Sequence, residues 1–134
     1  MSDPSLEMQA AIVAALKQVG ALPAEVGGRV FDKVPAGAAF PYVSLGPLQV
    51  LPDKAGCIDG AELFQQIDVW SREAGYPEVK KIAAAIVVKL DDQPLSVAGQ
   101  DVVVFEHSDT RYLRDPDGLT SHAVINFRSL IFPT

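Results

Sequence analysis

Apolar side chains recur at helical spacing in two stretches of the chain. In residues 4–19 one stripe contains Met8, Ile12, Ala15, Leu16 and Val19. In residues 77–90 the stripe contains Val79, Ile82, Ala83, Ile86 and Leu90. Because residues three and four positions apart share one side of a helix, both stretches are predicted to be helices that bury one face. Boundary signals agree, with Asp3-Pro4 and Gly75-Tyr76-Pro77 at the starts and Gly20 at the first end.

Four other stretches are typical of strands, because they carry alternating polarity or short apolar runs. They are residues 42–50, 62–71, 102–113 and 121–131. Gly46-Pro47 interrupts the first and predicts a bulge, a bend or an edge position. The turn signal at 115–118, Asp-Pro-Asp-Gly, predicts that the last two strands form an antiparallel hairpin. Residues 30–31 are either a short strand or an irregular turn, and residues 51–60 are expected to form a flexible loop.

The order of these elements predicts an α+β fold. A helix is followed by two or three strands, a second helix and a hairpin, which favours a mainly antiparallel sheet of about four strands with both helices packed on one face. At 134 residues the chain has the length of one domain, so residues 1–134 are expected to fold as a unit.

Two surfaces of this predicted fold carry apolar side chains that the helices and sheet do not cover. The sheet face away from the helices would present Phe64, Trp70 and Val124 among polar residues. The outer side of the second helix would present Lys81, Ala84, Ala85 and Val88. A neighbouring subunit is the simplest cover for such surfaces. The predicted subunit interface therefore consists of Phe64, Trp70, Lys81, Ala84, Val88 and Val124.

Charge and composition exclude several classes of function. The net charge is −6, and the longest basic run is Lys80-Lys81, whereas binding to nucleic-acid phosphates or anionic lipids needs clustered cations. No apolar run approaches the roughly 20 residues of a membrane helix, and no signal peptide is evident. Cys57 is the single cysteine, so an intrachain disulfide is impossible.

The residues that could support catalysis are few. His107, His122, Asp109 and Ser121 would allow a hydrolase or a small ligand-binding site only if they converged in a pocket. Both histidines alternate with apolar neighbours in predicted strands, which favours a place on the sheet surface. Cys57 has no neighbouring base, and the turn at 115–118 lacks calcium ligands at the spacing of an EF-hand. No cofactor, metal ion or catalytic residue is therefore expected.

Five segments together resemble a known protein family. They are SDPSL (2–6), VGGRVFD (26–32), FPYVSLG (40–46), DVWSR (68–72) and LRDPDGLT (113–120). In this order and spacing they resemble the tail-completion, or tail-terminator, proteins of long-tailed phages, prophages and gene transfer agents. The resemblance covers almost the whole chain.

The resemblance implies a subunit of a hexameric ring that has no cofactor. Such a ring caps the head-proximal end of the tail tube, ends tube polymerisation and joins the tail to the neck of the head. The implied partners are further copies of the chain, the tube protein and a stopper or connector protein of the neck, with DNA passing through the ring without specific binding. The implied location is the bacterial cytoplasm during assembly and then the phage-like particle.

Two segments that carry proline and glycine, residues 47–60 and 107–119, are predicted to dock these partners through exposed charges. The charged residues are Asp53, Lys54 and Asp59 in the first and Arg111, Arg114, Asp115 and Asp117 in the second. A solvated hairpin tip is an equal alternative for the second group. Another neck or minor virion component remains an alternative to the terminator, and a small hydrolase or ligand-binding domain using His107 and His122 is a third reading.

Overall fold

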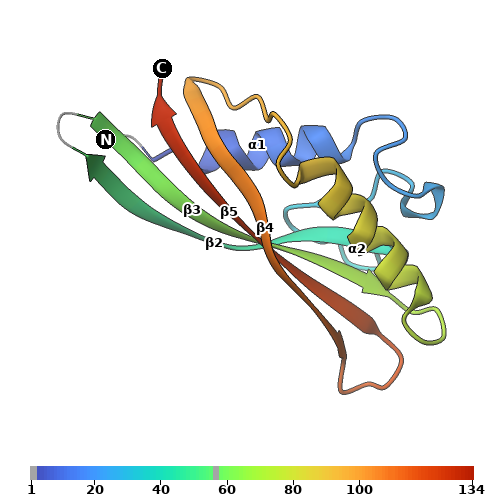
Figure 1. Cartoon of the computed structure of the whole chain (residues 1–134). Helices are drawn as coiled ribbons and strands as arrows, with labels where there is room; N and C mark the ends of the chain where they lie inside the picture. The colour runs from blue at the N-terminus through green and yellow to red at the C-terminus, as the bar shows by residue number, and fades with distance from the viewer. Residues whose placement is uncertain (1–2, 56–57) are drawn as a thin grey trace.

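The computed structural model describes residues 3–55 and 58–134, with the side chains of residues 53–58 outside the description. Along these described residues, two α-helices, a short 3-10 helix and five strands follow one another (Figure 1). They are α1 (Ser5–Leu16), η1 (Ala24–Val26), β1 (Val30–Phe31), β2 (Tyr42–Ala55), β3 (Ile58–Ser71), α2 (Pro77–Leu90), β4 (Gln100–Arg114) and β5 (Ser121–Pro133). The strands form one sheet in the order β1-β2-β3-β5-β4.

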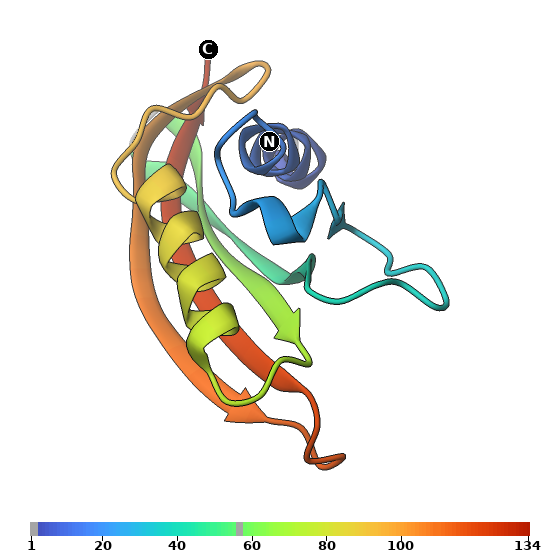
Figure 2. The same ribbon diagram turned by 90° about the vertical axis from the view of Figure 1, so that its right-hand side faces the viewer.

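Both helices cover the same face of the sheet, which confirms the predicted α+β class. Figure 2 views the sheet nearly edge-on and shows α1 and α2 together on its concave side. The helix stripes and the side of the strands beneath them form a common apolar cluster that includes Met8, Ile12, Ile86, Ile125 and Phe127. The opposite, convex side of the sheet carries no helix of the described part of the chain, and we call it the open face.

The stripe of α2 is buried at every predicted position, whereas the stripe of α1 ends early. Val79, Ile82 and Ile86 are fully buried, and Pro77 occupies the first turn as predicted. Val19 was predicted to be buried but is fully exposed. The reason is that α1 ends at Leu16, and the chain then turns through Gly20, whose φ of 78° takes it away from the helical path.

The β2–β3 hairpin corrects the prediction of a flexible loop at residues 51–60. These strands pair from Tyr42↔Trp70 through to Ala55↔Ile58, with a bulge between Leu45 and Leu48 that confirms the irregularity predicted at Gly46-Pro47. Pro52 is tolerated because β1 pairs only with Val43 and Ser44, which leaves that part of β2 on the edge of the sheet.

A fifth strand also distinguishes the structure from the expected sheet of about four strands. β1 pairs in parallel with β2 through Val30↔Val43 and Phe31↔Ser44, so the sheet is mixed. The pairing is reinforced by the amide of Val43, which donates a hydrogen bond to the carbonyl oxygen of Arg29 at 2.9 Å. Two residues are too few to show the alternating polarity of a strand. Residues 30–31 are therefore a strand only because they pair with β2.

Candidate assembly surfaces

A row of aromatic side chains crosses the open face at the end where β2 begins. Tyr42, Trp70 and His122 stand side by side on β2, β3 and β5 because the register pairs Tyr42 with Trp70 and Trp70 with His122. The rings of Trp70 and His122 stack with their centroids 3.7 Å apart. The indole N–H of Trp70 donates to the hydroxyl of Ser44 at 3.0 Å. Burial of this row raises the pKa of Tyr42.

Polar contacts beside this row fix its geometry. The Nε2 atom of His122 lies 2.7 Å from the carboxylate of Asp68, whose residue is only 6% exposed. The side-chain amide of Gln66 donates to the same oxygen at 2.9 Å. Hydrogen bonds and stacking therefore hold these side chains of the open face in one arrangement. A surface that is rigid before binding loses little conformational entropy when a partner docks on it.

The predicted interface residues of the open face differ in how much surface they offer. Phe64 and Trp70 are partly exposed. Val124, in contrast, is 2% exposed, because it lies in the centre of the sheet between Asp68 of β3 and Arg111 of β4. Val124 can thus contribute almost no contact area, and it belongs to the interior of the subunit.

The two histidines lie on opposite faces of the sheet, so they do not form a common site. His107 pairs with the buried Phe127, and its backbone N–H donates to Asp91 at the end of α2, which places it on the helix side. His122 is on the open face with Trp70. The carboxylate of Asp109 accepts a hydrogen bond from Asn126, whereas the hydroxyl of Ser121 donates to the carbonyl oxygen of Gly75. Because these side chains do not converge, the hypothesis of a hydrolase site that uses His107 and His122 is wrong.

Neither a metal site nor a membrane-spanning helix is present among the residues that the structure describes. Among residues 3–55 and 58–134, no three His, Cys, Asp or Glu side chains group closely enough to hold a metal ion. None of the helices in this part of the chain is long and apolar enough to cross a membrane. Cys57, the thiol considered above, falls outside the described residues.

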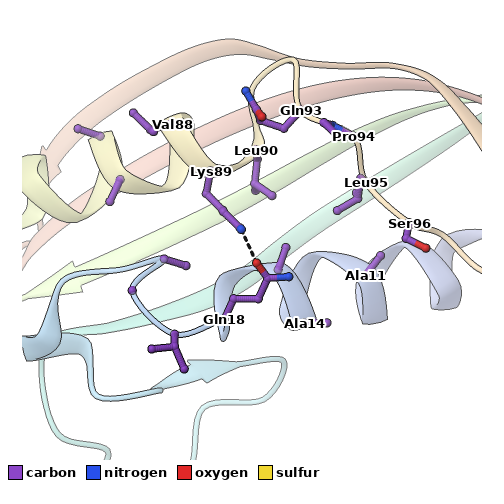
Figure 3. A pocket seen from close by; sticks show the side chains of 16 residues that line it. Ala11, Ala14, Gln18, Val88, Lys89, Leu90, Gln93, Pro94, Leu95 and Ser96 are labelled. Carbon is purple, nitrogen blue, oxygen red and sulfur yellow. Dashed lines mark hydrogen bonds between the residues drawn. The ribbon is translucent and has the colours of Figure 1, made fainter.

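A groove separates α1 from the C-terminal half of α2 (Figure 3). Its volume is about 810 Å³. Small apolar side chains dominate its walls, with Ala11 and Ala14 on α1 and Ala84, Ala85 and Val88 on α2. Lys89 donates a hydrogen bond to the side chain of Gln18 across it.

Ala84 and Val88 are exposed as predicted. Lys81, one turn before Ala85, forms an exposed ion pair with Glu25 at 3.0 Å.

The α1 wall of the groove was missed at the sequence level. Residues 5–16 contain only three polar side chains, Ser5, Glu7 and Gln9, so α1 is apolar on nearly all sides. A helix of this kind is expected to be covered all round. The excess of apolar residues in α1 was the sequence feature that could have predicted an uncovered apolar surface on this helix.

The end of the β4–β5 hairpin is a well-ordered turn. The carboxylate of Asp117 accepts hydrogen bonds from the backbone N–H groups of Leu119 and Thr120 at 2.8 and 3.0 Å and from the hydroxyl of Thr120. These hydrogen bonds lower the pKa of Asp117, and the bond from the backbone of Leu119 has the largest effect. Gly118 adopts a φ of 72°, as the predicted turn requires. Leu119, which sequence reasoning passed over, is 67% exposed.

Basic and aromatic side chains gather beside this turn. The guanidinium of Arg114 lies 4.7 Å from the ring centroid of Tyr76, and the ammonium of Lys80 lies 5.2 Å from that of Tyr112. Arg111, Arg114 and Asp117 are exposed and Asp115 is partly exposed. The charged side chains at this end of the hairpin are therefore accessible to a partner. A docking role for residues 107–119 stays a prediction.

The other predicted docking segment is the β2–β3 hairpin rather than a loop. Asp59 is exposed on β3. Asp53 and Lys54 belong to β2 by their backbone pairing with Gly60 and Asp59, whereas their side chains are outside the described part. A docking role for this hairpin therefore stays a prediction.

Residues 10–131 match the family described as tail completion protein gp17. The chain belongs to this family. Tail completion proteins are structural components of virions, which agrees with the expectation that the chain is not an enzyme. Its role is structural, in a phage-type tail, together with other tail proteins.

A solved structure with the same fold supports this assignment. It is a chain in the virion of a native gene transfer agent particle, which superimposes with a TM-score of 0.90 at 27% sequence identity. The match covers 98% of the present chain and 99% of that chain. None of the curated proteins compared matches the chain.

Proposed function

We propose that this tail completion protein caps the head-proximal end of a phage-like tail tube, ends tube polymerisation and joins the tail to the neck of the head. The observation that carries the proposal is the end-to-end match to a chain that stands in an assembled gene transfer agent particle. Residues 1–134 act in this role as one domain, and copies of the chain form a closed ring, as a hexamer.

The surfaces described above support a role in assembly. The chain exposes an apolar groove on its helix side and a rigid aromatic row on its open face, so two different sides are suited to protein contacts. Its net charge of −6 suits a ring through which DNA passes, because a basic lumen would retain the DNA. Assembly takes place in the bacterial cytoplasm, where the ring meets the tube protein on one side and a stopper or connector protein on the other.

Deletion of the gene in a particle-producing strain tests this function. We expect tails of uncontrolled length that fail to join heads, seen by electron microscopy of the lysate, and rescue by the intact gene. Tails of normal length that lack heads would instead identify a neck component that joins without terminating. Particles of normal form and number would contradict both roles.

A further inference from the structure

Two apolar features lie at opposite ends of the subunit. The groove is lined by α2 residues from Ala84 to Leu90, in the C-terminal half of that helix (Figure 3). The β4–β5 turn lies beside the N-terminus of α2, where Ser121 donates to the carbonyl oxygen of Gly75 and Arg72 donates to Thr120. Figure 1 shows the hairpin extending past this end of the helix. Features at opposite ends cannot meet within one copy, whereas they can meet between copies.

The groove is shaped to receive an apolar side chain. The alanines of its walls leave room for another chain to approach closely, and Val88 at its edge is 77% exposed. Lys89 is the single charged residue among the described residues that line it. The groove therefore favours a segment that combines an apolar side chain with negative charge.

The β4–β5 turn has this composition. Residues 115–119, Asp-Pro-Asp-Gly-Leu, carry two carboxylates, one large apolar side chain and no cation. The carboxylate of Asp117 is already held by Leu119, Thr120 and an ion pair with Arg72 at 4.0 Å, so Asp115 supplies the available negative charge. The hydrogen bonds to Asp117 hold the backbone around Leu119 in place before any contact forms. An ordered turn loses little conformational entropy on binding, so Leu119 is a pre-organised apolar contact.

We propose that the β4–β5 turn of one copy inserts Leu119 into the α1–α2 groove of the next copy, with Asp115 facing Lys89. This inference rests on the proposed ring. The contact is head-to-tail, because each copy gives its turn to one neighbour and its groove to the other. Head-to-tail contacts of this type generate closed rings when the rotation between copies closes.

Cysteine crosslinking in purified particles tests the contact. In a Cys57→Ser background, Leu119→Cys and Val88→Cys are introduced into the same chain, and particles are oxidised mildly. Both positions are exposed, so neither substitution disturbs the fold. We expect a ladder of covalent oligomers on non-reducing gels. A mixture of the two single variants should stop at covalent dimers, because each copy then carries only one of the two cysteines.

A matched control pairs Val88→Cys with Leu51→Cys, since Leu51 is also exposed but lies on β2, outside both the groove and the turn. No ladder is expected from this pair. A second measurement uses Leu119→Asp, for which we expect about a tenfold or greater loss of joined particles, against Leu51→Asp with little change.

The outcomes separate this inference from the proposed function. Absence of the 119–88 crosslink in particles that contain the protein would overturn the contact and leave the terminator role standing. An equal ladder from the control pair, or normal joining by Leu119→Asp, would also overturn it. Absence of the protein from purified particles would refute the terminator role and the contact together.

Discussion

Gly60 lies directly beneath the ring of Phe132 on the neighbouring strand. A Cβ atom at Gly60 would come within 2.4 Å of a ring carbon of Phe132 and 3.0 Å of the carbonyl oxygen of Ile131. Such contacts are too short for van der Waals packing, so β3 and β5 can approach one another here only without a side chain. At this position the residue type is set by the neighbouring strand.

Gly60→Ala is therefore expected to lower the free energy of unfolding by about 1–3 kcal/mol, as overpacking does in other proteins. Urea denaturation followed by circular dichroism measures the change. The double variant Gly60→Ala with Phe132→Leu serves as the control, because the smaller side chain makes room for the added methyl group. An unchanged free energy of unfolding in Gly60→Ala would show that the strands shift without cost.

His122 joins two kinds of contact at a single position. Its ring stacks on Trp70, and its Nε2 atom meets the nearly buried carboxylate of Asp68. Loss of the ring would remove the stacking and leave Asp68 with the amide of Gln66 as its remaining side-chain partner among the described residues.

We expect His122→Ala to lower the free energy of unfolding by about 2–3 kcal/mol, from lost stacking and from a carboxylate left with too few partners. Chemical denaturation with Trp70 fluorescence as the probe measures it. The same substitution in an Asp68→Ala background should have a clearly smaller effect. Equal effects in both backgrounds would exclude coupling between His122 and Asp68.

At the scale of elements, the β4–β5 hairpin depends on one charged side chain in its turn. The bonds from Leu119 and Thr120 are made to the ionised form of Asp117, and they lower its pKa in the folded protein. A lowered pKa stabilises the fold above the ordinary Asp pKa of about 3.9, and this stabilisation disappears as pH falls through the folded value.

Asp117→Asn should accordingly destabilise the protein at neutral pH and have a diminishing effect as the solution is acidified to about pH 2. The asparagine keeps an acceptor oxygen, so the pH-dependent part reports the charge. Denaturation at several pH values measures the difference between variant and native protein. Asp115→Asn is the control, because the carboxylate of Asp115 has no hydrogen-bond partner among the described residues. A difference for Asp117→Asn that is constant with pH would argue against a role for the charge.

At the scale of the whole molecule, cations concentrate near the β4–β5 turn although the chain is acidic. Arg111 and Arg114 are exposed on the last residues of β4, and neither forms an ion pair within the described part of the chain. Cations without an ion pair at a projecting end can steer an acidic partner other than the neighbouring copy's groove, and within the subunit Arg114 adds only its contact with Tyr76.

Charge reversal of Arg111 and Arg114 to Glu should reduce the yield of joined particles at least about tenfold, whereas the free energy of unfolding should fall by no more than about 1 kcal/mol, the order of the Arg114–Tyr76 contact. Particle titre and chemical denaturation measure the two effects. Reversal of Lys17 and Lys33, which are also exposed, changes net charge equally and controls for it. Equal losses of titre in both double variants would assign the effect to net charge.

The sequence determined the elements whose signals are local. The stripe of α2, its start at Pro77 and the turn at 115–118 were all predicted, because helix periodicity, proline geometry and turn chemistry depend on residues a few positions apart. The sequence also showed that Ala84 and Val88 would be exposed apolar residues, and the resemblance of five short segments identified the family.

Only the tertiary structure decided the features that depend on distant neighbours. β1 became a strand through its contact with β2, Pro52 is accommodated because β2 is an edge there, and Val124 is buried by the strands on either side. The groove likewise exists only because α1 and α2 lie next to one another on the sheet. The physical reason is that the spacing of apolar residues along the chain determines which side of a helix or strand each residue occupies. What that side contacts depends on how elements far apart in the chain pack together.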